Sequence, residues 1–309
     1  MKMKKPYWKK MTAANRSANA ISTALSFLCL WLSCSFSHAQ PDSAAVDRKK
    51  LHTFIIASGV GYTAGLVALN HIWYKNTERQ SFRFFNDNAQ WKQMDKGGHF
   101  FSSFYLSDIP ARFLKRYNVA EKKAHLIGAL SGFLVMLPIE VFDGHSDGYG
   151  ASLGDLVANA AGPAFFLGQQ LAWKEIRIHP KFSFQRSGYA ALRPDLLGEN
   201  LLGEIVKDYN GQTYWLSFDV DKFMVFPRWL NIAAGYGAEE MVHGRDRENR
   251  DLGFRPYRQF YLAIDFDLSA IRTRSKLIKT MLYVVNMVRL PAPAFEISRR
   301  GSKFHPFFF

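Results

Sequence analysis

The chain has 309 residues, and its 40 Lys and Arg against 26 Asp and Glu give a formal net charge of +14 at pH 7. This balance favours an anionic partner such as a membrane surface. Both cysteines, Cys29 and Cys34, lie in an N-terminal segment that we expect to be removed. The mature chain would then hold no disulfide and no thiolate metal site.

Residues 1–39 have the pattern of a secretory signal peptide. Six Lys and Arg precede an uncharged run over residues 20–32, and Ser37-His38-Ala39 supplies a small-x-small cleavage pattern. Cleavage leaves a net charge of +8 and a length that suits one or two domains. The residues before Cys34 form a poor lipobox, so we expect simple cleavage without lipidation. Nucleic acid is not an expected partner of an exported chain.

Four apolar segments are predicted to be helices, over residues 51–74, 98–117, 122–141 and 155–173. Glycines four residues apart occur in the first of them (Gly61, Gly65) and in the third (Gly128, Gly132). This spacing lets helix backbones approach closely. The sequence therefore predicts an apolar four-helix bundle over residues 48–178, resting on a membrane or partly inserted in it.

Residues 181–309 are predicted to be β-rich with one further helix, so the expected fold class is α+β. Asn210-Gly211 lies between two strand-like runs within 204–217, which is a strong hairpin signal. Apolar and polar side chains alternate over 258–269, as a half-buried strand requires. Residues 275–289 return to a helical period. The region is too short for a complete eight-stranded transmembrane barrel, but one face of its sheet can still lie against a membrane.

Polar and charged residues gather at one end of the expected bundle, because successive helices run in opposite directions. Three of them open the second helix, two close the third, and three share a face at the start of the fourth. The cluster predicted in this way consists of Asp95, Lys96, His99, Glu140, Asp143, Ser152, Asp155 and Asn159.

Three motifs carry these residues: W-x-Q-x-D-K-x-G-H at 91–99, E-x-x-D-G at 140–144, and G-x-S-x-G-D-x-x-x-N-x-x-G at 150–162. In this order they resemble the YfiM-type family of predicted periplasmic lipoproteins, a domain of unknown function. A looser form of the set resembles VanZ-like membrane proteins. The resemblance implies a helical fold and a location in the periplasm or at the outer membrane, and it brings no established reaction.

A structural role would explain the cluster. Ser152 or Asp155 can cap the fourth helix, as Ser and Asp commonly do. Lys96 can form a buried ion pair with Glu140 or Asp155 that fixes the register of the helices. The function that we expect on this basis is that of an exported, membrane-associated envelope protein with a binding or structural role. Its partner would be a membrane surface or another envelope component.

A catalytic or metal site is the alternative. His99, Glu140, Asp143 and Asp155 offer the donors that a divalent metal ion such as Mg²⁺, Mn²⁺, Ca²⁺ or Zn²⁺ takes. His99, oriented by Asp95, can also act as a general base, with Lys96 binding an anionic headgroup. Such an enzyme would act on a lipid or phosphate-ester substrate of the envelope. Ser152 lacks the strand–turn–helix context of a nucleophile elbow, which argues against a serine hydrolase.

Overall fold

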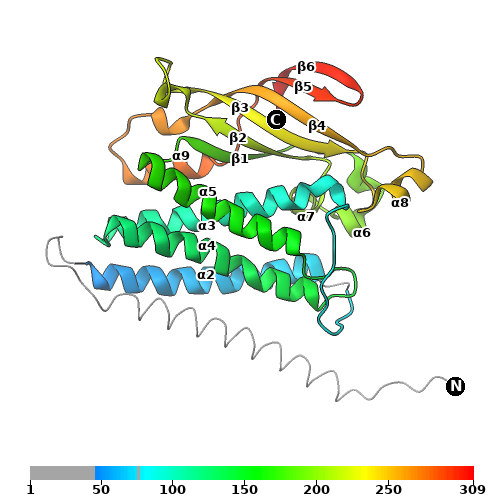
Figure 1. Cartoon of the computed structure of the whole chain (residues 1–309), viewed down its shortest axis with the longest axis horizontal. Coiled ribbons are helices and arrows are strands. Elements are labelled where there is room, and N and C mark those ends of the chain that lie inside the picture. Colours follow the sequence, from blue (N-terminus) through cyan, green and yellow to red (C-terminus); the bar gives the residue numbers. More distant parts are fainter. Residues whose placement is uncertain (1–45, 75–76) are drawn as a thin grey trace.

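The computed structural model describes residues 46–74 and 77–309, so the expected signal peptide lies outside the described residues. Figure 1 shows an antiparallel sheet above a layer of long helices. The described chain contains eight α-helices, from α2 to α9, and six strands in one sheet. The expected α+β class is confirmed.

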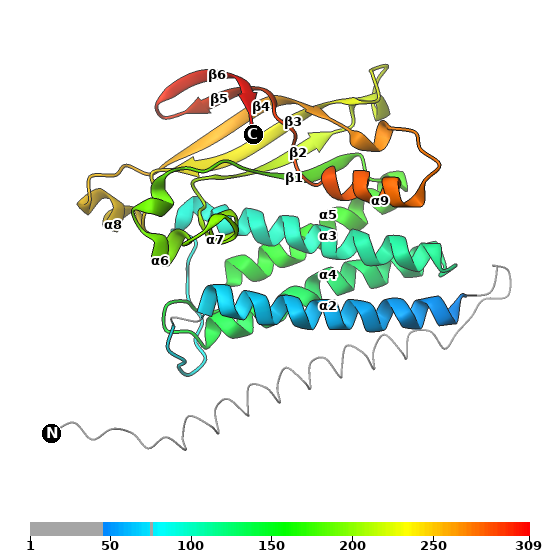
Figure 2. The same cartoon turned by 180° about the vertical axis from the view of Figure 1, so that it is seen from behind.

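All four apolar segments of the first half are helices: α2 (Arg48–Tyr74), α3 (Met94–Arg116), α4 (Glu121–Gly144) and α5 (Leu153–Trp173). Helices α3 and α5 lie between the sheet and the other two helices (Figures 1 and 2). Small residues bring α3 and α4 close together. A Cβ atom on Gly128 would lie 2.5 Å from the carbonyl oxygen of Ser107, and one on Gly132 would lie 2.5 Å from that of Ser103.

Helix α2 is attached to this unit less closely. The Phe54 ring stacks on Phe113 at a centroid distance of 4.6 Å, and the Tyr62 hydroxyl donates to the carbonyl oxygen of Val135 at 2.8 Å. Apart from the adjacent residues and the nearby backbone of α2 itself, no atom of the described residues lies within 4 Å of a Cβ placed on Gly61 or Gly65. The close approach expected at paired glycines is therefore confirmed for α4 and wrong for α2.

The sheet is a meander in which each strand pairs antiparallel with the next. Its strands are β1 (Ile178–Phe184), β2 (Gln212–Phe218), β3 (Leu230–Glu239), β4 (Tyr257–Phe266), β5 (Ala292–Ser298) and β6 (Gly301–Phe308). Helix α3 supports the start of this sheet. The Tyr105 hydroxyl donates to the carbonyl oxygen of Pro180 at 2.6 Å, and Gly97 leaves room for the Tyr214 ring, which a Cβ there would meet at 2.6 Å.

The outer face of the sheet is apolar, whereas its inner face combines polar side chains with a small buried cluster around Trp215 and Tyr261. On β4, Gln259 and Asp265 are buried, whereas Phe260 and Leu262 are 54% and 59% exposed. The same outer face includes Ile264 on β4 and continues on other strands with Ile232, Phe295, Ile297 and Phe304. The predicted alternation is thus confirmed, but the large apolar side chains of β4 lie on its exposed face, and Gln259 and Asp265 are buried beside Tyr261 and Ala263. In a soluble antiparallel sheet the solvent-facing side is usually polar, so the apolar outer face is the unusual feature of this one.

Hydrogen bonds and ion pairs satisfy most of the polar interior. Lys181 Nζ lies 2.7 Å from Asp265 Oδ2, and both side chains are almost completely buried. Arg289 donates from Nη1 to the carbonyl oxygen of Phe308 and from Nη2 to that of Ile264. The Arg289 guanidinium also lies over the Trp215 ring, 4.3 Å from its centroid. Burial of these groups is tolerable because each of them has partners.

The second half contains more helix than the sequence indicates. Its helices are α6 (Pro194–Leu197), α7 (Leu201–Lys207), α8 (Asp246–Asp251) and α9 (Lys276–Val285), so the expectation of one further helix was wrong. Short 3₁₀ turns occupy Trp91–Gln93, Tyr189–Ala191, Val220–Lys222 and Leu268–Ala270.

The hairpin predicted at Asn210-Gly211 does not form, because the run before it is helix α7. The Asn200 side chain caps this helix by accepting a hydrogen bond from the Gly203 amide at 2.9 Å. Strand β2 begins after the turn and pairs with β1 and β3 instead. The side-chain amide of Asn210 instead contacts the loop after β3, where it donates to the carbonyl oxygen of Met241.

Candidate functional site

The polar cluster forms where the sequence places it, at the end of the helices where α3 and α5 begin and α4 ends. The structure brings together seven of the eight predicted side chains and adds an aspartate from the preceding loop. Its members are Asp87, Asp95, Lys96, His99, Glu140, Ser152, Asp155 and Asn159.

Lys96 is the centre of the first half of the cluster. Its Nζ lies 2.7 Å from Asp87 Oδ2, 3.0 Å from Asp95 Oδ2 and 2.9 Å from Asp155 Oδ1. Burial alone would lower the pKa of this lysine, but the charges of Asp95 and Asp155 outweigh burial and raise it. The ammonium group therefore stays charged and joins α3, α5 and the preceding loop.

Asp87 is the member that the sequence analysis missed. It also accepts a hydrogen bond from Ser152 Oγ at 2.5 Å. Burial disfavours its charged form, but hydrogen bonds from Lys96 and Ser152 lower its pKa overall. Asp87 lies in a loop eight residues before Asp95, and no helical spacing connects it to the motifs. Periodicity therefore could not have found it.

His99 is the centre of the second half. Its Nδ1 lies 2.9 Å from Asn159 Oδ1, and Asn159 Nδ2 donates to Glu140 Oε1 at 3.2 Å. Since an amide oxygen only accepts hydrogen bonds, Nδ1 carries the proton in this contact. His99 Nε2 then faces Asp155 Oδ1 at 3.9 Å, which is too long for a hydrogen bond.

Ser152 is the N-cap of α5. Its Oγ accepts a hydrogen bond from the Asp155 amide at 3.2 Å, and its own amide donates to Glu140 Oε2 at 3.2 Å. The capping role considered for Ser152 is confirmed. The cap also links the start of α5 to the end of α4, because Glu140 is its second partner.

The cluster contains more acid than base. Burial raises the pKa of Asp95 to about 7, and the charge of Asp155 adds to this shift. Burial also raises the pKa of Asp155, against the opposing charges of His99 and Lys96. Asp155 Oδ1 is buried and close to Lys96 Nζ, but it accepts no hydrogen bond of good geometry from the described residues. These carboxyl groups compete for one lysine, so a proton or another cation would stabilise them.

Two groups of side chains have ligand atoms close enough for a metal ion. One consists of His99, Glu140 and Asp155, the other of Asp87, Asp95 and Asp155, and the ligand atoms of each lie within 4.8 Å of one another. Lys96 Nζ already lies among the three aspartates of the second group. Only the first group therefore suits a divalent ion, with one imidazole and two carboxylates.

Asp143 is the predicted residue that the structure places apart. Its Oδ1 accepts a hydrogen bond from the Tyr74 hydroxyl at 2.7 Å, which ties α4 to the end of α2. Asp143 belongs to neither group of close ligand atoms among the described residues. Side chains three residues apart on a helix point in similar but not identical directions. Glu140 points toward the cluster, whereas Asp143 points toward α2.

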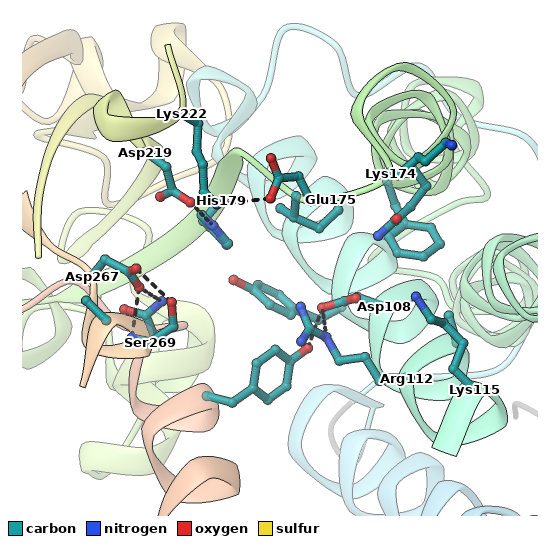
Figure 3. A pocket seen from close by; sticks show the side chains of 18 of the residues that line it. Asp108, Arg112, Lys115, Lys174, Glu175, His179, Asp219, Lys222, Asp267 and Ser269 are labelled. Atoms are coloured by element: carbon teal, nitrogen blue, oxygen red, sulfur yellow. Dashed lines mark hydrogen bonds and ion pairs between the residues drawn. The ribbon is translucent and has the colours of Figure 1, made fainter. Parts of the chain in front are cut away.

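A cavity of about 690 Å³ lies near the other end of the helices, between α3, α5 and the sheet (Figure 3). No predicted site residue lines it. Its acidic groups have partners: Asp108 accepts from Arg112 Nε at 2.7 Å, and Asp219 lies 3.0 Å from His179 Nε2. The cationic side chains of the lining are Arg112, Lys115, Lys174, Lys222, Arg228 and Arg272.

Residues 83–168 match a family described as predicted periplasmic lipoprotein (DUF2279). The match contains α3, α4, most of α5 and every member of the cluster, and it leaves the sheet outside. No curated protein and no solved structure matches the chain. The expected location, in the periplasm or associated with the outer membrane, agrees with the description of this family. The description names no reaction.

Proposed function

We propose that this chain is an exported envelope protein that is held at a membrane and has a binding or structural role there. The observation that carries the proposal is the apolar outer face of the sheet, with Phe260, Leu262 and Ile264 exposed and Gln259 and Asp265 buried. An apolar band on the outside of strands with polar residues inside is the pattern of lipid-facing strands. In water, an exposed apolar patch of this kind indicates an interaction surface.

The helices support the same proposal. By length and composition, α2 and α4 are apolar enough to cross a membrane. The side chains of Ile56, Val60 and Val67 on α2 are exposed. We propose that α2 completes a four-helix bundle with α3, α4 and α5 and that its outer face contacts lipid. The resemblance of the three motifs to the YfiM-type family and to VanZ-like membrane proteins supports this proposal.

In this function the polar cluster is a network that fixes the ends of the helices. Lys96 connects the loop before α3 with α5, through Asp87 and Asp155. His99, Asn159 and Glu140 connect α3, α5 and α4 in one chain of contacts. Polar groups buried with partners in this way specify one register of the helices.

Cell fractionation with carbonate extraction tests the membrane proposal. We expect the chain in the membrane pellet after carbonate treatment, while a soluble periplasmic protein followed as a control is released. Release by carbonate would show that the protein is attached peripherally and is not an integral membrane protein. Recovery in the cytosol with residues 1–39 retained would contradict the proposal.

A second candidate is a metal-dependent or acid/base enzyme acting on a lipid or phosphate ester. It is favoured by one observation, the buried Asp155 Oδ1 beside His99 and Glu140, whose contact with Lys96 Nζ at 2.9 Å is an ion pair without good hydrogen-bond geometry. An ion held by these three residues would act as a Lewis acid or supply an activated water. His99, whose Nδ1 is held by Asn159, would present Nε2 to the ion or to a substrate proton.

Metal analysis separates the two candidates. The enzyme candidate predicts about one equivalent of a divalent ion per chain, or turnover of phosphate-ester and lipid-headgroup substrates. His99→Ala should abolish this property and leave the fold intact, whereas His71→Ala, an exposed histidine on α2, should change nothing. A metal-free protein without turnover would reject the enzyme candidate.

A further inference from the structure

Helix α9 exposes its apolar face and turns a polar contact toward the rest of the molecule. The exposed apolar side chains follow helical spacing and are Leu277, Ile278, Met281, Val284 and Val285. No residue of α9 is buried. On the opposite side, the Tyr283 hydroxyl donates to Asp108 Oδ2 at 2.8 Å, and Asn286, just after the helix, is buried. The apolar stripe of an ordinary surface helix faces the core, and that of α9 faces away from it.

Contacts at both ends of α9 hold the helix in place. The Ser275 hydroxyl caps the helix by accepting from the Ile278 amide at 3.3 Å. Asn286 Oδ1 accepts from Lys181 Nζ at 3.1 Å and from the Leu268 amide at 3.0 Å. A helix of ten residues is marginal alone, so these contacts and Tyr283 hold it beside β1 (Figure 2). The outward direction of its apolar face is therefore a property of the fold.

The segment around α9 is strongly basic. Residues 271–290 contain no Asp or Glu. Four exposed cations lie at its start and along the helix: Arg272, Arg274, Lys276 and Lys279. None of the four forms an ion pair with another described residue. A short helix with an exposed apolar face and unneutralised cations is complementary to a surface that is both anionic and oily.

We propose that α9 lies in the interface of an anionic bilayer, with its apolar face among the acyl chains and its four cations at the lipid phosphates. The inference rests on the proposed function and names the element and the lipid class that the function uses. A second copy of the chain suits this surface less well, because a two-fold contact of α9 with itself would bring like charges together.

The cavity of Figure 3 lies beside this segment, and its lining holds both cations and carboxylates. Arg272 and Tyr283 belong to its lining, together with Lys115, Lys174 and Lys222. Lys115 and Lys222 have acidic partners, Glu121 and Glu175, whereas Lys174 and Arg272 form no ion pair among the described residues. An anionic headgroup beside α9 therefore meets cations from α5 and from the segment before α9.

Vesicle flotation tests the inference. The chain without the expected signal peptide, residues 40–309, is synthesised in a cell-free system in the presence of vesicles of phosphatidylcholine alone or of phosphatidylcholine with 30% phosphatidylglycerol. We expect several-fold higher recovery with the anionic vesicles, and a loss of this preference in high salt. Lys279→Glu should lower the partition onto anionic vesicles by at least about fivefold. Arg247→Glu, which changes an exposed arginine on α8, is the matched control and should have little effect.

The apolar face has its own matched pair. Leu277 on α9 and Leu202 on α7 are 71% and 72% exposed, so neither substitution by Asp removes a core contact. Leu277→Asp should reduce flotation with both vesicle types, and Leu202→Asp should not. Unchanged flotation of Leu277→Asp and Lys279→Glu, with the wild type bound, would overturn the role of α9 and leave membrane attachment standing. A wild type that floats with neither vesicle would contradict both proposals.

Discussion

The side chains around Lys96 determine what the cluster can do. One ammonium group is shared by Asp87, Asp95 and Asp155, and all four side chains are largely buried. A charge that loses its partner in such a place remains poorly solvated, and this costs more than the ion pair contributes by itself. The contribution of the network to stability is therefore measured best by removing one of its members.

Lys96→Met should lower the free energy of unfolding by about 3–5 kcal/mol, because it strands buried carboxylates. Chemical denaturation measures this change. Lys50→Met is the matched control, since Lys50 pairs with Asp47 at 2.6 Å on the exposed start of α2 and should leave the unfolding midpoint almost unchanged. Equal stability of the Lys96 variant and the wild type would show that the network does not hold the helices.

Asp95 makes stability depend on pH. Its pKa is raised by burial to about 7 in the folded chain, whereas the pKa of an aspartate in the unfolded chain is about 4. Between these two values the folded state binds more protons than the unfolded state, so this residue makes stability fall as pH rises. The loss is at most about 1.4 kcal/mol per pH unit and ends above the folded pKa.

Asp95→Asn should remove this dependence. We expect the variant to be no more stable than the wild type near pH 4 and relatively more stable at pH 7. Unfolding curves of both proteins across this range measure the difference. A difference that does not change with pH, or one that changes in the opposite direction, would contradict a raised pKa of Asp95.

Among the elements, the pair α3 and α4 is the most closely packed part of the helical layer. The glycines of α4 let it approach the backbone of α3, whereas those of α2 face no described atom within 4 Å. The same sequence pattern therefore has two structural outcomes in one chain. Contact with a neighbouring helix, and not spacing alone, decides whether a glycine is needed.

Gly132→Ala should lower the free energy of unfolding by about 1–3 kcal/mol, because the new methyl group would lie against the Ser103 carbonyl oxygen. Gly61→Ala should be neutral or raise stability by up to about 1 kcal/mol, since alanine favours a helix and has open space there. Thermal unfolding of the two variants compares them. Equal destabilisation would mean that α2 also packs through its glycines.

At the scale of the whole molecule, one buried ion pair joins two non-adjacent strands of the sheet, and its lysine also contacts the residue after α9. Lys181 on β1 contacts Asp265 on β4, donates to the carbonyl oxygen of Phe266 and reaches Asn286 beyond α9. The sheet depends on such contacts, because its inner face buries charged groups next to the apolar cluster around Trp215, and a buried charge needs a partner.

Lys181→Met should therefore destabilise the molecule by about 3–5 kcal/mol by leaving the Asp265 carboxylate unpaired. The double variant Lys181→Met/Asp265→Leu should recover most of this loss, since apolar side chains of similar size replace the pair. A double-mutant cycle of unfolding free energies measures the coupling. Additive losses would show that the pair does not act as a unit.

The sequence by itself determined the four long helices, the alternation of strand β4 and seven of the eight members of the cluster. These features depend on local spacing and on the alternating direction of successive helices. The helical period and the two-residue period of a strand each divide an element into two faces. Because successive helices run in opposite directions, polar residues at the end of one helix and the start of the next lie at the same end of the layer. The helix α9 also follows from its period, although it ends at Val285.

Only the tertiary structure decided which faces are buried and which loop completes the cluster. Period two divides β4 into two faces but does not say that Gln259 and Asp265 lie inside, because burial depends on the partner elements and on the surrounding solvent. Asp87 joins Lys96 through a loop that no periodicity describes, and Asp143 turns to Tyr74 because α2 lies beside it. Local pattern fixes the faces of each element, and packing between elements assigns each face its environment.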